Sequence, residues 1–240
     1  MTTVDILVIG AHPDDAEVGV GGLIHKMASK GYSVGILDLT EGELASRGSP
    51  KERAKEARTS SKILGASRRE CVKLKDGRVA NTTEQQQKLI PFLRSFRPKI
   101  LVAPMSDDRH PDHGAAHDLV RDANYLAGLT QLDPDAQRDP HRAMRRFFYR
   151  VYGDPTPPQL VMDITDHMDA KLEALQQYKS QFYNPEYEGV PTYVSSPQFW
   201  DFVHTRAAYW GNRIGVKYGE PLFITRPVGI DTLPTLEMIE

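Results

Sequence analysis

The chain has 240 residues, and its 30 lysines and arginines nearly balance 32 aspartates and glutamates, which gives a formal net charge of −2. This balance excludes a protein whose overall charge recruits nucleic acid or an anionic membrane surface. The composition, 40% hydrophobic and 26% charged, is that of a globular protein and not of a disordered one. The single cysteine, Cys71, excludes an internal disulfide and a cysteine-rich zinc module, and we expect it to be a buried structural thiol.

The sequence carries no signal for export or membrane insertion. No apolar run approaches the ~18 residues that a membrane span requires, and residues 1–10 lack the basic, apolar and small-residue regions of a secretory signal. The sequence therefore predicts a cytoplasmic protein that binds neither membranes nor nucleic acid.

The first half of the chain alternates strand and helix patterns. Residues 4–10 form a short apolar, β-branched run that is typical of a strand buried on both faces, and Ser49 followed by Pro50 marks a helix start. The same patterns predict further strands at 34–39 and 99–103 and helices at 17–31, 51–64, 83–96 and 114–129. This alternation predicts an α/β fold with a Rossmann-like open, mostly parallel sheet flanked by helices.

The second half of the chain is less regular. Its patterns predict strands at 146–152 and 159–164, helices at 166–182 and 198–214, a loop at 184–197 and a loose tail from Asp231. We expect one domain over residues 1–240, with a Rossmann-like core at 1–130 and additional strands, helices and substrate-site loops at 131–230.

Two short motifs place histidine and aspartate at one edge of the predicted sheet. His12, Asp14 and Asp15 occupy the turn after the first strand, and His110-Pro-Asp-His113 follows the strand at 99–103. Open α/β sheets bind ligands at the carboxyl ends of their strands. If these two strands are neighbours, the motifs converge on one site.

Imidazole and carboxylate groups together suit Zn²⁺ or another divalent ion. His12 and Asp15, three residues apart across a turn, can both reach one ion, and either His110 or His113 would complete a three-ligand catalytic site. Asp14 would then lie beside the ion, where it can take a proton from a metal-activated water, and the remaining histidine would stabilise an oxyanion. This set of groups predicts hydrolysis of an amide.

Other interpretations compete with this one. Each His-Pro-Asp motif alone could be a turn that caps the following helix. Gly19, Gly21 and Gly22 suggest a nucleotide-binding oxidoreductase, but they fall after the helix has begun and not in the turn where a pyrophosphate binds. A non-catalytic metal-binding protein would have no need of Asp14 beside the ligands.

The motifs as a set resemble those of the PIG-L-type (LmbE-like) zinc-dependent N-deacetylases. The matching segments are Ala-His-Pro-Asp-Asp-x-Glu at 11–17, Thr-Glu-Gly-Glu at 40–43, Arg-Gly at 47–48, Arg-x-x-Glu-Ala at 53–57 and His-Pro-Asp-His at 110–113. The resemblance implies a Rossmann-like enzyme that uses Zn²⁺, or another divalent metal, to remove acetyl groups from amino sugars. By that similarity the metal ligands are His12, Asp15 and His113. The other site residues are the general base Asp14, His110 as oxyanion stabiliser or acid with its orienting partner Asp112, and the sugar-binding Arg53.

Within that family, the second half is most similar to the deacetylases of bacillithiol biosynthesis. The shared features lie at 163–172, 178–182 and 215–221, with Arg206 on the last long helix. This similarity implies N-acetylglucosaminyl malate as the substrate, with diacetylchitobiose as the alternative, and it implies a homo-oligomer. It also makes Arg142 a candidate substrate contact, whereas Asp108 stands where other members carry a tyrosine.

Uneven charge along the chain bears on the substrate. Residues 46–75 hold ten basic and three acidic residues, and residues 138–150 hold five arginines and one acid. Solvated helix faces would explain part of this pattern. We expect the rest to form a basic rim around the metal centre, suited to an anionic amino-sugar substrate.

Overall fold

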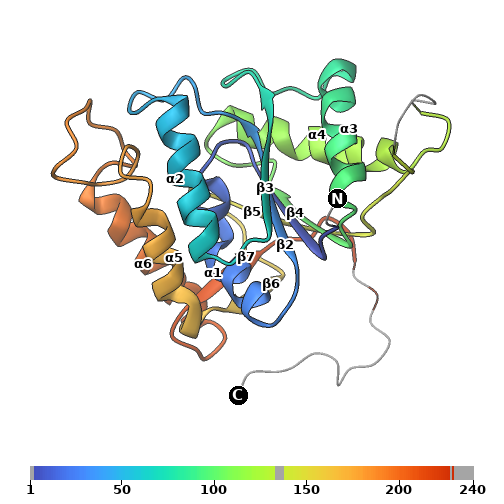
Figure 1. Ribbon diagram of the computed structural model, residues 1–240. Coiled ribbons are helices and arrows are strands. Elements are labelled where there is room, and N and C mark those ends of the chain that lie inside the picture. Colours follow the sequence, from blue (N-terminus) through green and yellow to red (C-terminus); the bar gives the residue numbers. More distant parts are fainter. Residues whose placement is uncertain (1–2, 133–137, 228, 230–240) are drawn as a thin grey trace.

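The computed structural model describes residues 3–132, 138–227 and 229, which form a layered α/β arrangement (Figure 1). Five parallel strands stand in the order β3-β2-β1-β4-β5. The strands are β1 (Ile6–Gly10), β2 (Val34–Thr40), β3 (Arg68–Leu74), β4 (Ile100–Pro104) and β5 (Arg145–Tyr149). Helices α1 (Asp15–Ser29) and α2 (Pro50–Ile63) cover one face of the sheet, and α3 (Thr83–Phe96) and α4 (Pro111–Ala127) cover the other. The predicted α/β fold with a parallel sheet is confirmed.

Two apolar cores, one on each face of the sheet, hold these layers together. Ile6 and Val8 of β1 pack into the core shared with α1 and α2, whereas Leu7 and Ile9 pack into the core shared with α3 and α4. Successive side chains of a strand point to opposite faces, so a doubly covered sheet requires apolar residues at every position of its central strand. All five residues of β1 are buried, as its sequence predicts.

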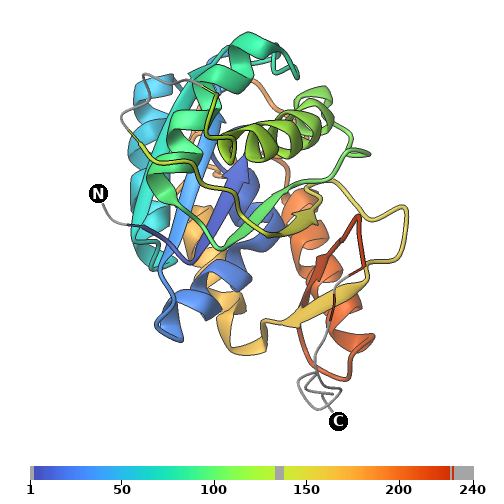
Figure 2. The same cartoon turned by 90° about the vertical axis from the view of Figure 1, so that its right-hand side faces the viewer.

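The C-terminal part packs outside α1 and α2. The 3₁₀ turn η1 (Thr165–His167) leads into α5 (Met168–Gln176), which contacts both helices. α6 (Pro197–Asn212) packs on a small antiparallel sheet of β6 (Leu160–Asp163) and β7 (Gly219–Leu222), which Figure 2 shows beside the main sheet. No helix of the described residues is long and apolar enough to cross a membrane.

α1 contains a break whose backbone groups are hydrogen-bonded by side chains of the C-terminal part. Val20 leaves the helical conformation (φ −144°, ψ 30°), which frees backbone groups on either side of it. The N–H groups of 22–23 donate to the Glu220 carboxylate at 2.9 and 2.6 Å, and Lys171 Nζ donates to the carbonyl of Val18 at 2.8 Å. Lys171 and Glu220 also pair with each other at 2.7 Å. We call this pair the α1 brace, because it ties α5 and β7 to the broken helix.

β3 is an element that the sequence pattern does not predict. Its segment begins Arg-Arg-Glu, and as an edge strand it is largely half-buried, so it lacks the apolar signature of β1. Arg69 nevertheless points into the protein, where Asp38 on β2 accepts from it at 2.7 and 2.9 Å. Cys71 on this strand is half-buried, not fully buried as expected, and burial raises the pKa of its thiol to about 12.

The remaining differences from the predicted elements concern the second half. β7 is not predicted either, because Gly219 and Pro221 weaken its strand pattern. The helix predicted at 166–182 is shorter and ends at Gln176. β5 is the fifth strand of the main sheet, so the sheet extends past the predicted core at 1–130. The tail predicted from Asp231 lies outside the described residues.

Candidate active site

The turn between β1 and α1 is tight and has an unusual backbone. A Cβ at Gly10 would lie 2.9 Å from the carbonyl oxygen of His12, so any side chain there would displace the turn. Asp14, the residue before α1, has φ 120°, a conformation that L residues rarely adopt. Strain of this kind persists where the surrounding structure fixes it, and it clusters at functional sites.

β1 pairs in parallel with β4, so the two His/Asp motifs meet at the carboxyl edge of the sheet. His12 Nδ1 lies 3.4 Å from Oδ2 of Asp15, and His113 Nε2 lies 3.2 Å from the same oxygen. None of the three residues is more than 8% exposed. The two motifs therefore contribute to one buried cluster, which we call the His/Asp cluster.

Carboxylates surround both histidines of the His/Asp cluster. Burial opposes a charge on each imidazole, but the carboxylates outweigh it and raise the pKa of His12 to about 12 and that of His113 to about 9. The carboxylates that act on His12 are those of Asp112, Asp15 and Asp76, and those that act on His113 are those of Asp15 and Asp108. Such a surplus of negative charge stabilises a cation at this position, whether imidazolium or metal ion.

Two carboxylates hold the far side of the His12 ring. Its Nε2 lies 3.1 Å from Asp76 Oδ1 and 3.3 Å from Asp112 Oδ2. The backbone N–H of Leu44 donates to Asp76, and that of Gly77 donates to Asp112, so both carboxylates are fixed. Carboxylates in this position set the tautomer and orientation of a metal-ligating histidine. Sequence reasoning missed Asp76, because the Asp-Gly turn that contains it follows the unpredicted strand β3.

His110 and Asp112 are arranged differently from the expectation. His110 caps α4 through its Nδ1, which accepts from the backbone N–H of Asp112 at 3.2 Å. The Asp112 carboxylate points to His12 instead, so it does not orient the His110 ring as the family resemblance implies. The two histidine rings lie 4.7 Å apart between centres, and burial lowers the pKa of His110, with the charge on His12 acting in the same direction.

Asp14 forms an ion pair with Arg53 at the wall of the site. Arg53 Nη2 donates to Asp14 Oδ2 at 2.7 Å, and its Nε donates to the carbonyl of Pro13 at 2.9 Å. Burial raises the pKa of Asp14 to about 7, although the Arg53 charge acts to lower it. Arg53 thus reaches the site as predicted, but its guanidinium is turned toward Asp14.

A cavity of about 350 Å³ opens beside these groups. Asp14 and Asp76 line its polar side, and Tyr152, Phe182 and Phe199 line its apolar side. Small-molecule sites have this combination of apolar walls and a few convergent polar groups. We call this cavity the pocket.

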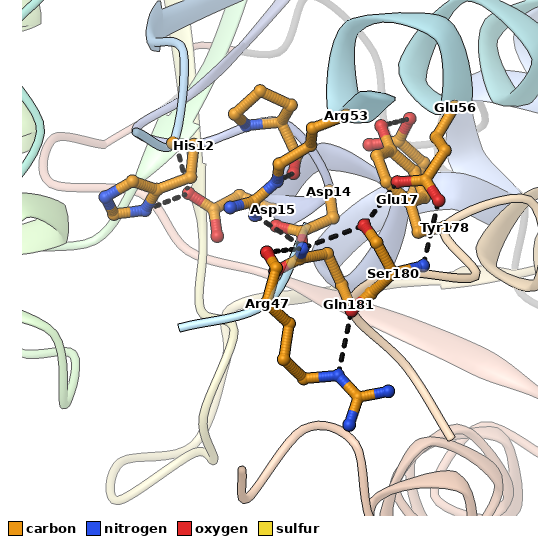
Figure 3. A network of polar contacts seen from close by, with 12 residues as sticks. His12, Asp14, Asp15, Glu17, Arg47, Arg53, Glu56, Tyr178, Ser180 and Gln181 are labelled. Carbon is orange, nitrogen blue, oxygen red and sulfur yellow. Dashed lines mark hydrogen bonds and ion pairs between the residues drawn. The ribbon is translucent and has the colours of Figure 1, made fainter. Parts of the chain in front are cut away.

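A buried polar network lies next in the chain to residues that line the pocket (Figure 3). Glu17, which is fully buried, accepts from the hydroxyls of Ser60 and Tyr178 at 2.8 Å each. Glu56 on α2 accepts from the N–H and the hydroxyl of Ser180 at 2.8 and 2.7 Å. These family-motif glutamates therefore fasten α1 and α2 to the chain that follows α5.

The predicted basic rim does not form around the pocket. Of the basic residues at 46–75, Arg47 and Arg53 line it. Arg47 donates to the carbonyls of Ser180 and Val190 at 2.9 and 3.4 Å, and Arg53 is held by Asp14. Both cations are thus bound within the protein.

Arg142 does not belong to this site. It precedes β5 and lies at the amino edge of the parallel sheet, in a surface hollow beside Lys99 and Ile100 at the start of β4. Its guanidinium donates to the carbonyl of Tyr125 at 2.6 and 3.1 Å and lies over the Tyr125 ring. The structure therefore does not bring Arg142 together with the His/Asp cluster, which lies at the opposite edge of the sheet.

The residues present fit a divalent metal ion. Two imidazole nitrogens close to one carboxylate oxygen are a ligand set that Zn²⁺ takes in three-ligand sites. The Asp108 carboxylate lies 3.2 Å from Nδ1 of His113, where it can orient that ring toward an ion. His110 also has a ring nitrogen within 4.8 Å of ligand atoms of His12 and His113. Fold and site together define an α/β protein with a buried His/Asp centre of the metal-binding type.

Comparisons with known proteins assign the family. The family model PIG-L, GlcNAc-PI de-N-acetylase, matches residues 7–124. The chain is 28% identical over 248 residues to diacetylchitobiose deacetylase of Thermococcus kodakarensis, a match that covers 98% of this chain and 88% of that protein. It is 26% identical over 190 residues to a probable N-acetyl-alpha-D-glucosaminyl L-malate deacetylase 2 of Bacillus anthracis, a match that covers 74% and 81%. The crystal structure of the conserved protein TT1542 from Thermus thermophilus matches with a TM-score of 0.86 and 38% identity, over 96% of this chain and 99% of that one.

The chain belongs to the PIG-L (LmbE-like) family. It is a deacetylase of that family, an enzyme that hydrolyses an amide bond. The predicted family and enzyme class are confirmed. The finer resemblance to bacillithiol-biosynthesis deacetylases is not, because the malate deacetylase matches a smaller part of this chain than the diacetylchitobiose deacetylase does.

Proposed function

We propose that the protein removes the N-acetyl group from a neutral N-acetylglucosamine conjugate such as diacetylchitobiose. In this proposal Zn²⁺, or another divalent ion, is held by His12, Asp15 and His113. The observation that carries the proposal is the His/Asp cluster, buried beside Asp14 at a pocket of about 350 Å³.

The side chains around the cluster divide the chemistry among them. The ion, when bound, lowers the pKa of a water and polarises an amide carbonyl. Asp14 accepts the proton of the attacking water at its carboxylate and later donates it to the departing amine. Arg53 keeps that carboxylate in place through its hydrogen bond of 2.7 Å. This division of roles is that of a metal-assisted amide hydrolase.

His110 supplies the remaining group, a donor for the oxyanion. Its Nδ1 accepts from the N–H of Asp112, so the neutral ring carries its proton on Nε2. That N–H is then available to the oxygen of the amide carbonyl as negative charge develops there. His110 therefore acts in this proposal as a neutral hydrogen-bond donor.

The charges that line the pocket favour a neutral substrate over the predicted anionic one. Asp14, Asp15 and Asp76 contribute carboxylates, whereas Arg47 and Arg53 are bound to protein partners. Because protein groups engage both arginines of the pocket wall, neither of them is a dedicated partner for a malate carboxylate inside the pocket. The similarity to diacetylchitobiose deacetylase over 98% of the chain also supports the neutral sugar.

Acetate release by the zinc-loaded protein tests this proposal. Diacetylchitobiose, N-acetylglucosamine and N-acetylglucosaminyl malate are compared side by side, with chelator-treated protein as the control. We expect the highest kcat/KM for diacetylchitobiose and background rates after chelation. A higher kcat/KM for the malate conjugate would overturn the neutral substrate, and the absence of acetate from all three would overturn the proposed function.

Three further expectations stay predictions. They are a single deacetylase domain over residues 1–240, a homo-oligomer and a cytoplasmic location. The apolar core on the α1 side includes residues from both halves of the chain, which supports the single domain. Sedimentation velocity of the purified protein would test the oligomer.

A further inference from the structure

An arginine and a tyrosine stack on each other at the mouth of the pocket. The guanidinium carbon of Arg109 lies 4.8 Å from the centre of the Tyr193 ring and 5.5 Å from that of Tyr152. Arg109 and Tyr193 are exposed, whereas Tyr152 lines the pocket and stacks on the His113 ring at 5.7 Å. A row of rings thus leads from the His/Asp cluster to the surface.

Within residues 3–132, 138–227 and 229, no group accepts a hydrogen bond from the Arg109 guanidinium. Neighbouring acids are engaged elsewhere: Asp107 pairs with Arg150, and Asp108 accepts from the backbone N–H of Val151. Among the described residues, no carboxylate or carbonyl accepts from this guanidinium. Unlike the arginines inside the pocket, Arg109 therefore presents free donors to a ligand.

Hydrogen bonds fix the backbone on either side of Tyr193, and an aromatic neighbour supports its ring. Thr192 and Ser195 on either side of it exchange hydrogen bonds, with the N–H of Thr192 donating to Ser195 Oγ at 2.8 Å and the N–H of Ser195 donating to Thr192 Oγ1 at 3.2 Å. The ring meets Phe199 edge to face at 5.5 Å, and Thr192 and Val194 line the pocket. A side chain ordered in advance loses little conformational freedom when a ligand binds.

We propose that Tyr193 and Arg109 form a subsite for the second sugar ring of the substrate. The proposal rests on the proposed function, because the first ring must place its acetamido group at the His/Asp cluster. The neighbouring ring then lies at the mouth of the pocket, where its apolar face stacks on Tyr193. The Arg109 guanidinium donates to its hydroxyl or acetamido oxygens.

A purely structural role is the competing explanation for this stack. The contact could simply tie the chain around Tyr193 to the loop between β4 and α4. The protein contains a matched pair in which that explanation holds: Arg142 lies over the Tyr125 ring at 4.0 Å, at the amino edge of the sheet and away from the pocket. Tyr125 and Tyr193 are 56% and 48% exposed, so the two stacks differ chiefly in their distance from the site.

Equilibrium binding to the zinc-loaded Asp14→Asn protein separates the two explanations, because we expect that variant to bind sugar but to hydrolyse it about 10²- to 10⁴-fold more slowly. Calorimetry compares diacetylchitobiose with N-acetylglucosamine. Tyr193→Ala and Arg109→Ala, each added to Asp14→Asn, should weaken binding of the disaccharide about 3- to 10-fold more than binding of the monosaccharide. Tyr125→Ala and Arg142→Ala should leave both affinities unchanged.

Each other outcome overturns the subsite in a recognisable way. Equal weakening of both sugars would mean that the Tyr193 stack is structural, and no change in either affinity would mean that the second ring binds elsewhere. If Arg109→Ala weakened N-acetylglucosaminyl malate and not diacetylchitobiose, the cation would serve an anionic group. If the Asp14→Asn protein bound neither neutral sugar, the proposed function would fail together with the subsite.

Discussion

Two buried ionic clusters lie along α1, and they differ in whether their charges are matched. At the α1 brace, Lys171 and Glu220 neutralise each other and take up the backbone groups that the helix break leaves free. At the start of the same helix, Asp15 faces His12 and His113 among further carboxylates, so negative charge is in excess. Both clusters are buried, but of the two, only the His/Asp cluster has an excess of negative charge.

The cavities beside the two clusters also differ, in volume. The cavity next to the brace measures about 10 Å³, against about 350 Å³ for the pocket. A closed and neutral set of charges can only stabilise the fold, whereas an unmatched set that faces a cavity can bind a ligand. Burial and charge alone therefore do not mark a functional site, because the α1 brace has both and lacks a cavity large enough for a ligand.

Removing His113 should abolish metal binding by the His/Asp cluster. His113→Ala deletes one of the three donors, so we expect zinc content to fall to near zero and deacetylation to fall to background. Elemental analysis and acetate release measure these effects. His117→Ala on the same helix is the control, because the His117 ring contacts the carbonyl of Pro104 and not the cluster. Full zinc content in the His113 variant would refute its assignment as a ligand.

Asp14→Asn should separate metal binding from turnover. The amide keeps the shape of the side chain but cannot accept a proton, so kcat should fall by about 10²- to 10⁴-fold while zinc stays bound. Steady-state kinetics on protein of measured zinc content provide the test. Turnover close to that of the unmodified enzyme would exclude Asp14 as the general base.

Breaking the α1 brace should affect stability and not chemistry. Glu220→Ala leaves the buried Lys171 without its counter-ion and the N–H groups of 22–23 without an acceptor. We expect the free energy of unfolding to fall by about 3–5 kcal/mol, measured by denaturant titration. At temperatures where the variant is folded, zinc content should match that of the unmodified protein.

An exposed ion pair provides the control for the brace. Lys99 pairs with Asp5 at 2.7 Å, but the lysine side chain is 79% exposed. Pairs in water contribute little to stability, so Lys99→Ala should shift the unfolding midpoint much less than Glu220→Ala. Equal shifts in the two variants would mean that matching of buried charge is not what makes the brace important.

The parts of the fold and site that the sequence predicts are those with local signals. β1 is uniformly apolar because it is covered on both faces, and Ser49 caps α2 through its side chain as its position before Pro50 predicts. His12 and His113 follow two strands that turn out to be neighbours. In each of these cases a few adjacent residues carry the whole signal.

The remaining parts depend on contacts between distant residues. Arg142 is one of several arginines in its segment, and linear charge does not say which edge of the sheet a residue occupies. Glu220 belongs to a family-like motif, but its role follows from the helix break at Val20, which no local pattern indicates. Asp76 follows the edge strand β3, and the charged residues of β3 do not give the apolar pattern by which a strand is predicted.

Asp76 offers the smallest and most selective test of the unmatched cluster. Its carboxylate holds His12 Nε2 at 3.1 Å and does not face the Asp15 oxygen that the two histidines share. Asp76→Ala should therefore weaken zinc binding by about 10- to 100-fold, as for other carboxylates that orient a histidine ligand. Competition with a chromophoric chelator measures the affinity.

A conservative variant shows whether Asp76 acts by position or by charge. Asp76→Asn can still hydrogen-bond to His12, so it should recover part of the zinc affinity if orientation of the ring is what matters. If Asp76→Asn recovers none of the zinc affinity, the effect comes from the lost negative charge. In that case Asp112→Asn should weaken zinc binding by a similar factor, because the Asp112 carboxylate faces the same His12 nitrogen at 3.3 Å. Zinc affinity unchanged in Asp76→Ala would mean that the surplus carboxylates around His12 are not part of the metal centre at all.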